Sequence, residues 1–154
     1  MKTKLLFCIA LLGLGLSGAA LYGHCEIPCG IYTDDMRIKM IEEHCKTIEK
    51  SMAQITALSK QPAQSAANQL VRWVHNKEHH AGEIQHIVTQ YFMTQRVKPA
   101  DPGDKKAYAA YVKKLTTLHG MLISAMKCKQ TTDPANVEKL RAGLKEFSKL
   151  YFVK

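Results

Sequence analysis

Residues 24–32, HCEIPCGIY, bring a histidine, two cysteines and a tyrosine into nine positions. Imidazole and thiolate are ligands for soft and borderline metal ions, and His24, Cys25 and Cys29 form a dense cluster of them. The stretch lacks the second Cys/His pair of a structural zinc site, and its Cys-x3-Cys spacing differs from that of redox and haem-attachment motifs. The pattern therefore favours a metal ion bound by this arm, with a plain Cys25–Cys29 disulfide as the alternative in an oxidising compartment.

The chemistry of the arm depends on whether His24 is the first residue of the working protein. Residues 1–23 are typical of a secretory signal peptide, with two lysines at the start, an apolar run and small residues up to Gly23. Cleavage after Gly23 would expose the amine of His24, whereas cleavage after Ala20 would leave three residues in front of it. We expect an exported protein, periplasmic or extracellular, without stable membrane association after cleavage; a retained N-terminal anchor is the alternative.

With His24 at the N-terminus, the arm can form a specific chelate. Its amine, the amide nitrogen of Cys25 and the Cys25 thiolate close two adjacent rings on one metal ion. The Cys29 thiolate completes a square plane, and the His24 imidazole can reach an axial position. Such nitrogen and sulfur donors suit Ni(II) or Cu(II). Pro28 stiffens the loop between the two sulfur atoms, and Gly30 allows backbone angles that other residues resist.

Four amphipathic segments follow the arm and must position it. The first begins near Asp34 and Asp35, acids that suit a helix N-terminus, and ends at residues 60–62. The second covers about 63–96 and the third about 104–127, and the fourth opens with Asp133-Pro134, a cap followed by proline. Apolar residues recur in each at steps of three and four: Ile38, Ile41, Cys45, Ile48, Met52 and Ile55; Leu70, Val74, Ala81, Ile84, Val88 and Tyr91; Tyr108, Tyr111, Leu115, Leu118, Leu122 and Ala125; and Val137, Leu140, Leu144, Phe147 and Tyr151.

These patterns predict an all-α protein, an antiparallel four-helix bundle with an irregular N-terminal metal-binding hook. The expected divisions are a removed signal peptide over 1–23, the hook over 24–33 and the bundle over 34–154. The second stripe is interrupted at residues 77–80, KEHH, which admits a polar group facing the core. Cys45 and Cys128 are predicted to be buried thiols, or to pair if their helices are neighbours.

The net charge is basic without a nucleic-acid signature. The formal charge of +9 falls to +7 when the leader takes its two lysines away. Because there is no Lys/Arg block and no interleaved aromatic platform, we expect no nucleic-acid partner. A positive field would, however, speed the arrival of a small anion.

The arm resembles the nickel hook of the nickel-containing superoxide dismutases. Residues 24–32 match each fixed position of that signature, His-Cys-x-x-Pro-Cys-Gly-x-Tyr, after a leader and before four helices. The resemblance implies one nickel ion per chain, bound by His24 through its amine and axial imidazole, by Cys25 through its amide nitrogen and thiolate, and by the Cys29 thiolate. Tyr32 would lie beside the open face of the nickel, where it orients or excludes the incoming anion.

The same resemblance implies an antioxidant oxidoreductase. Members of the family cycle between Ni(II) and Ni(III), convert superoxide to dioxygen and hydrogen peroxide, and assemble as hexamers. In the family an acid on the first helix and an arginine on the second support the hook. Here Lys39 takes the place of the acid, and Glu78 and His80 are candidate substitutes, although a solvated face is the simpler interpretation of residues 78–80.

Three other interpretations remain open at this point. Glu83-Ile-Gln-His86 is a Glu-x-x-His pair of the kind used by di-iron bundles, but the chain offers no second pair. A non-enzymatic periplasmic nickel- or copper-binding bundle would use the same hook without turnover. Tyr32 could serve only as a packing anchor for the loop.

Overall fold

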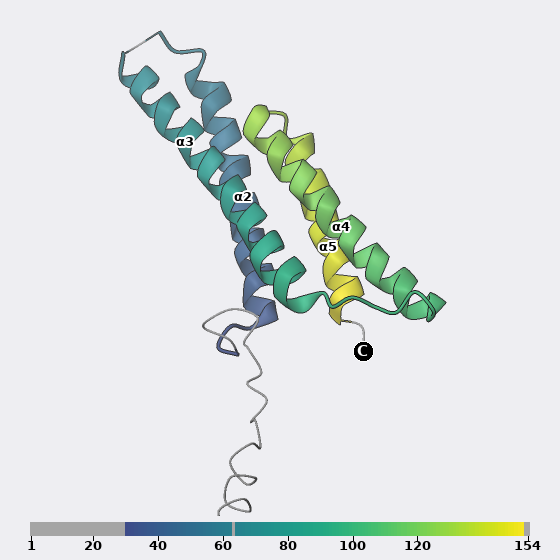
Figure 1. The fold of residues 1–154 in the computed structure, drawn as a ribbon. Coiled ribbons are helices and arrows are strands. Elements are labelled where there is room, and N and C mark those ends of the chain that lie inside the picture. The colour runs from purple at the N-terminus through teal and green to yellow at the C-terminus, as the bar shows by residue number, and fades with distance from the viewer. Residues whose placement is uncertain (1–29, 63, 153–154) are drawn as a thin grey trace, which may run out of the picture.

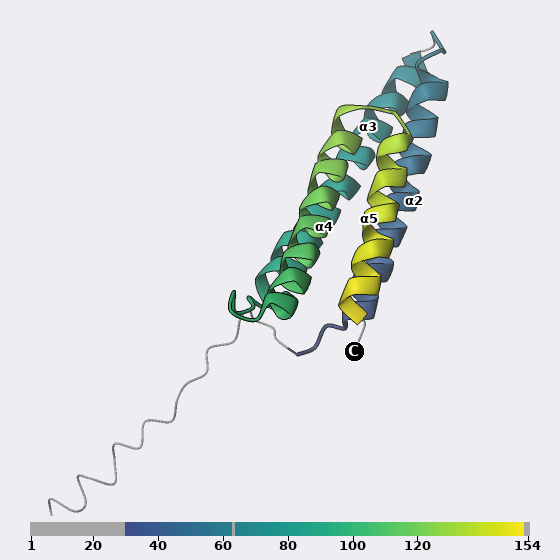
Figure 2. The same ribbon diagram turned by 90° about the vertical axis from the view of Figure 1, so that its right-hand side faces the viewer.

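The computed structural model describes residues 30–62 and 64–152, and these residues fold as a bundle of antiparallel helices (Figures 1 and 2). Helix α2 spans Asp34–Leu58, α3 spans Gln64–His86 and continues into a π-helix, η2, over Ile87–Arg96. Helices α4 (Lys105–Gln130) and α5 (Ala135–Phe152) complete the bundle. The predicted all-α four-helix bundle is confirmed. Its N-terminal hook lies mostly outside the described residues.

Helix starts follow the capping residues that the sequence offers. Asp104 accepts hydrogen bonds from the amides of Lys106 and Ala107 at 3.1 and 3.0 Å, and Asp133 accepts one from Ala135 at 3.0 Å. These bonds satisfy amides that would otherwise have no partner in the first turn. Both predicted start sites are therefore confirmed.

The core is built from the predicted stripes, with two corrections at their ends. Most stripe residues are buried, and Phe92 and Phe147 meet edge to face with ring centroids 4.9 Å apart. Val74, predicted as core, is 39% exposed. It lies in the first half of α3, and at that end the α2–α3 hairpin extends past the α4–α5 turn (Figures 1 and 2). Tyr108, also predicted as core, is 40% exposed in the first turn of α4 at the other end of the bundle.

The interruption in the second stripe is filled by Lys77. Its side chain is buried, and its Nζ donates to the backbone carbonyls of Cys128 at 2.7 Å, Thr131 at 3.3 Å and Lys129. These carbonyls lie at the C-terminal end of α4, where a helix leaves its last acceptors unpaired and carries partial negative charge. The lysine therefore caps α4 from α3 and joins the two halves of the bundle.

Cys45 on α2 and Cys128 on α4 are free, fully buried thiols. Burial raises the pKa of Cys45 to about 12 and that of Cys128 to about 11. Both therefore remain protonated thiols at neutral pH, the less reactive form. Within the described residues, no helix is long and apolar enough to cross a membrane.

Candidate functional site

The described chain begins at the base of the predicted hook. Gly30 has φ +81°, an angle that favours glycine and agrees with the prediction for this position. Tyr32 follows and is 42% exposed. The predicted ligands His24, Cys25 and Cys29 lie outside the described residues.

The carboxylate of Asp34 forms hydrogen bonds or an ion pair with three side chains at the end of the bundle where Tyr32 lies. The Tyr91 hydroxyl donates to its Oδ1 at 2.6 Å, and the Tyr151 hydroxyl donates to its Oδ2 at 2.9 Å. The Arg96 Nε lies 3.0 Å from Oδ1, at an angle that makes an ion pair but no hydrogen bond. Asp34 thus joins the start of α2 to the ends of η2 and α5, which are distant in sequence.

The same cluster contacts the backbone of Tyr32. The Arg96 Nη2 donates to the Tyr32 carbonyl at 3.4 Å and to the Tyr91 hydroxyl oxygen at 3.0 Å. The Tyr91 hydroxyl also lies 3.4 Å from that carbonyl, but its one hydrogen favours the shorter contact with Asp34. The cluster therefore holds Tyr32 by its backbone and forms no hydrogen bond with its side chain.

The π-helix explains how Tyr91 and Arg96 come to lie together. In an α-helix, residues five apart point about 140° away from one another. In η2 the bonding shifts by one residue: the Val97 amide bonds to the carbonyl of Phe92, five positions back. Arg96 consequently lies over the ring of Tyr91, with its Cζ 5.0 Å from the ring centroid. Such stretches are frequent at functional sites.

The two tyrosines of the cluster are held in their neutral form. Burial and the Asp34 hydrogen bond raise the pKa of Tyr91, and the same two causes raise that of Tyr151 well above its usual range. The Tyr91 hydroxyl raises the pKa of Arg96. At neutral pH both tyrosines are therefore neutral hydroxyl donors and Arg96 is a guanidinium cation.

The candidate substitutes for the family's acid and arginine lie elsewhere. The side chain of Glu78 is 43% exposed, and its carboxylate lies 3.6 Å from the Lys77 ammonium. His80 meets His44 of α2, with the two Nδ1 atoms 2.7 Å apart. Since ten residues separate His44 from Asp34, this pair lies roughly 15 Å along the helix from the base of the arm.

The acid and arginine beside Tyr32 are Asp34 and Arg96. The sequence singled out Asp34 only as an acid suited to a helix start, and it placed Tyr91 only in a core stripe. The sequence pattern did not indicate a role for Arg96, because an α-helical period of 3.6 residues does not place it on the same face as Tyr91. Tyr151 likewise looked like core.

No competing metal site lies in the part of the chain that the structure describes. Over residues 30–62 and 64–152, no group of three or more His, Cys, Asp or Glu side chains is placed to hold a metal ion. The Glu83–His86 pair of the di-iron interpretation therefore gains no partner there.

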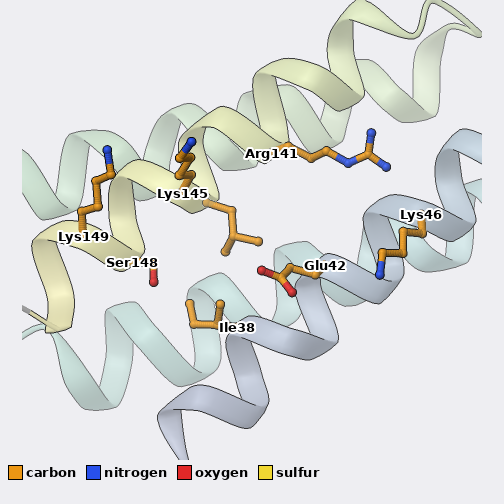
Figure 3. A pocket seen from close by; sticks show the side chains of 8 residues that line it. Ile38, Glu42, Lys46, Arg141, Lys145, Ser148 and Lys149 are labelled. Carbon is orange, nitrogen blue, oxygen red and sulfur yellow. The ribbon is translucent and has the colours of Figure 1, made fainter.

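A groove between α2 and α5 also contains none of the predicted site residues (Figure 3). Its volume is about 430 Å³, and Ile38, Glu42 and Lys46 of α2 face it. From α5, Arg141 lines it with its guanidinium 2.7 Å from both Glu49 and Glu138. This cation is thus neutralised within the bundle.

Comparison with known proteins identifies a family for nearly the whole chain. The family described as nickel-containing superoxide dismutase matches residues 19–154. No curated protein and no solved structure matches the chain.

Proposed function

The chain belongs to the family of nickel-containing superoxide dismutases, and from this premise we propose that His24, Cys25 and Cys29 hold its nickel ion. The protein is a nickel-dependent oxidoreductase that converts superoxide to dioxygen and hydrogen peroxide. The observation that carries the ligand assignment is the complete hook signature over residues 24–32, inside the matched range.

The donor set fits nickel. One imidazole, an N-terminal amine, a backbone amide and two thiolates would supply the nitrogen and sulfur donors that suit nickel. Bound nickel would supply one-electron redox chemistry by alternating between Ni(II) and Ni(III). The positive φ of Gly30 turns the chain directly after Cys29, which supports a compact hook.

Tyr32 is the gate in this proposal. Its exposed ring and its backbone, held by the Arg96 guanidinium, suit a side chain that orients or excludes anions without binding the metal. We expect Tyr32→Phe to leave the nickel content unchanged and to alter turnover or inhibition by anions. A variant with normal kinetics would assign Tyr32 to loop packing alone.

Processing at Gly23 activates the protein, because a preceding residue would replace the amine of His24 with an amide. The leader-like residues 1–23 support export to the periplasm or the extracellular space. Intact-mass analysis of the native protein should give a start at His24 and one nickel ion per chain. A start at Leu21 with full activity would refute this step.

The decisive variant is Cys29→Ser, matched by Cys128→Ala, which removes a thiol that lies in the core. We expect Cys29→Ser to lose nickel and dismutase activity while its helical circular dichroism stays unchanged. The Cys128→Ala control should keep both nickel and activity. Full activity in Cys29→Ser would overturn the ligand assignment, and bound nickel without dismutation in the parent protein would favour a metal carrier.

We propose further that the protein is a homo-oligomer, specifically a hexamer. Three large apolar side chains are exposed at the hook end of the bundle: Ile31 at 71%, Met36 at 54% and Phe152 at 43%. Where exposed apolar side chains form one patch, that patch commonly marks a contact between subunits. Light scattering coupled to size exclusion should give six chains, and the double variant Met36→Gln/Phe152→Gln should lower that number.

A further inference from the structure

Two arginines flank the base of the hook, and they differ in what neutralises them. Arg96 is paired with the Asp34 carboxylate at 3.0 Å. Arg37 stacks instead on aromatic rings, with its Cζ 4.2 Å from the ring centroid of Tyr32 and 5.3 Å from that of Tyr91. Among the described residues, no carboxylate lies within ion-pair distance of Arg37.

No carboxylate of the described residues therefore neutralises the charge of Arg37. Among residues 30–62 and 64–152, its side chain donates one hydrogen bond, from Nη1 to the neutral Met40 sulfur at 3.1 Å. Asp35 is two positions away on the helix, a spacing at which side chains do not face each other. A guanidinium that stacks on a ring still presents N–H groups along its edge, and the described residues use only one of the five.

Further cations lie at the same end of the bundle. Arg96, Lys98 and Lys114 line a hollow of about 260 Å³ whose lining contains no acidic residue. The Lys114 ammonium lies 6.0 Å from the ring centroid of Tyr151, which bonds to Asp34. Cations placed in this way favour the approach of an anion.

We propose that Arg37 draws superoxide to the Tyr32 gate and holds it there through its free N–H edge. The proposal rests on the assignment of Tyr32 as the gate. Superoxide is a small monoanion, and a cation beside its entrance raises its local concentration and its rate of arrival. Arg37 thus acts on encounter and binding and takes no part in electron transfer.

Arg37 could alternatively serve only to hold the ring of Tyr32, and two substitutions separate these roles. Arg37→Lys keeps the charge but loses the planar stacking group, whereas Arg37→Gln loses the charge. If Arg37 guides the anion, the Arg37→Lys variant should keep most of the parent's kcat/KM. The Arg37→Gln variant should have a kcat/KM about three- to tenfold lower at low ionic strength. If it only supports the ring, both variants should lose activity equally.

Arg72→Gln is the matched control. Arg72 is exposed on the first half of α3, at the opposite end of the bundle, and its contact is with the neutral Gln69 at 3.4 Å. The substitution changes the net charge by the same amount without touching the hook. We expect it to leave kcat/KM and its dependence on ionic strength unchanged.

The experiment measures kcat/KM of the nickel-loaded variants between 10 and 200 mM salt, with nickel content determined for each. The parent should lose activity as salt rises, because the charges are screened beyond about 10 Å at 0.1 M. Arg37→Gln should show a flatter dependence at unchanged nickel content. A Gln variant that equals the parent, or one whose salt dependence matches that of the parent, would overturn the proposal.

A second readout does not depend on turnover. Azide, a small monoanion, should shift the Nε–H resonance of Arg37 in the reduced, nickel-loaded protein and leave that of Arg72 in place. The absence of any shift at Arg37 would also overturn the proposal. Failure of the proposed function would appear differently, as a parent protein without dismutase activity.

Discussion

Replacing Asp34 by asparagine tests whether one carboxylate holds the hook end of the bundle together. The substitution keeps the size of the side chain but removes its charge and turns one acceptor oxygen into a donor amide. Only one of the two tyrosine hydroxyls, Tyr91 at 2.6 Å or Tyr151 at 2.9 Å, can still find an acceptor there. The ion pair with Arg96 is lost as well.

The expected loss of stability follows from these contacts. A hydrogen bond to a charged acceptor contributes about 1.5–3 kcal/mol, so losing one and weakening the other costs about 2–3.5 kcal/mol. The ion pair adds at most about 1 kcal/mol, because both of its side chains are nearly one third exposed. We expect the free energy of unfolding to fall by about 2–4 kcal/mol, or roughly 6–16 °C in Tm for a bundle of this size.

Asp35→Asn is the matched control for this measurement. Asp35 is the next residue on the same first turn and is exposed, so its substitution removes the same charge from the helix N-terminus. That common contribution is about 0.3–1 kcal/mol. Urea unfolding followed by far-UV circular dichroism on both nickel-loaded variants isolates the cluster. If Asp34→Asn were no less stable than Asp35→Asn, the reasoning about the cluster would be wrong.

Three further predictions concern stability. Lys77→Met should lower the free energy of unfolding by about 2–4 kcal/mol, because it removes the donor that pairs with one buried and two part-buried carbonyls. Lys127→Met, at an exposed position of α4, is the control, and equal unfolding midpoints of the two variants would contradict the capping role. Burial, followed by charge interactions with neighbouring side chains, lowers the pKa of both His44 and His80, so the stability they contribute is present above about pH 6.5 and is lost as pH falls. His80→Asn should therefore flatten the decline in unfolding free energy between pH 7 and 5, and a profile parallel to that of the parent would refute the assignment. Because folding raises the pKa of Tyr151, its contribution to the free energy of unfolding is present below about pH 10 and is lost above that pH. The free energy of unfolding of Tyr151→Phe, measured by urea titration, should therefore fall less steeply at alkaline pH than that of the parent. An equally steep fall in both proteins would contradict this role of Tyr151.

The fold could be predicted from local signals. These signals each act over one or two helical turns: apolar stripes with steps of three and four residues, acids at helix starts, and the proline after Asp133. Together they predicted the helix boundaries to within a few residues. The interruption at Lys77 correctly indicated a polar group in the core. The exposure of Val74 and Tyr108 could not be foreseen, because it depends on how far each helix extends beyond its neighbours.

The chemistry of the site divides in the same way. The hook signature concentrates its metal donors within six consecutive residues, so a nickel site can be inferred from sequence alone, and the family match agrees with the activity it implies. The surroundings of Tyr32 come instead from three distant segments: Asp34 at the start of α2, Arg96 at the end of η2 and Tyr151 at the end of α5.

No local pattern joins these three segments, because their contacts depend on the antiparallel packing of whole helices and on a π-helical shift of one residue. A carboxylate that receives two hydroxyls is recognisable only when all three segments are in place. The sequence by itself therefore predicted which residues would bind the metal. Only the tertiary structure decided which residues hold the backbone of Tyr32 and that Arg37 forms no ion pair with the described residues.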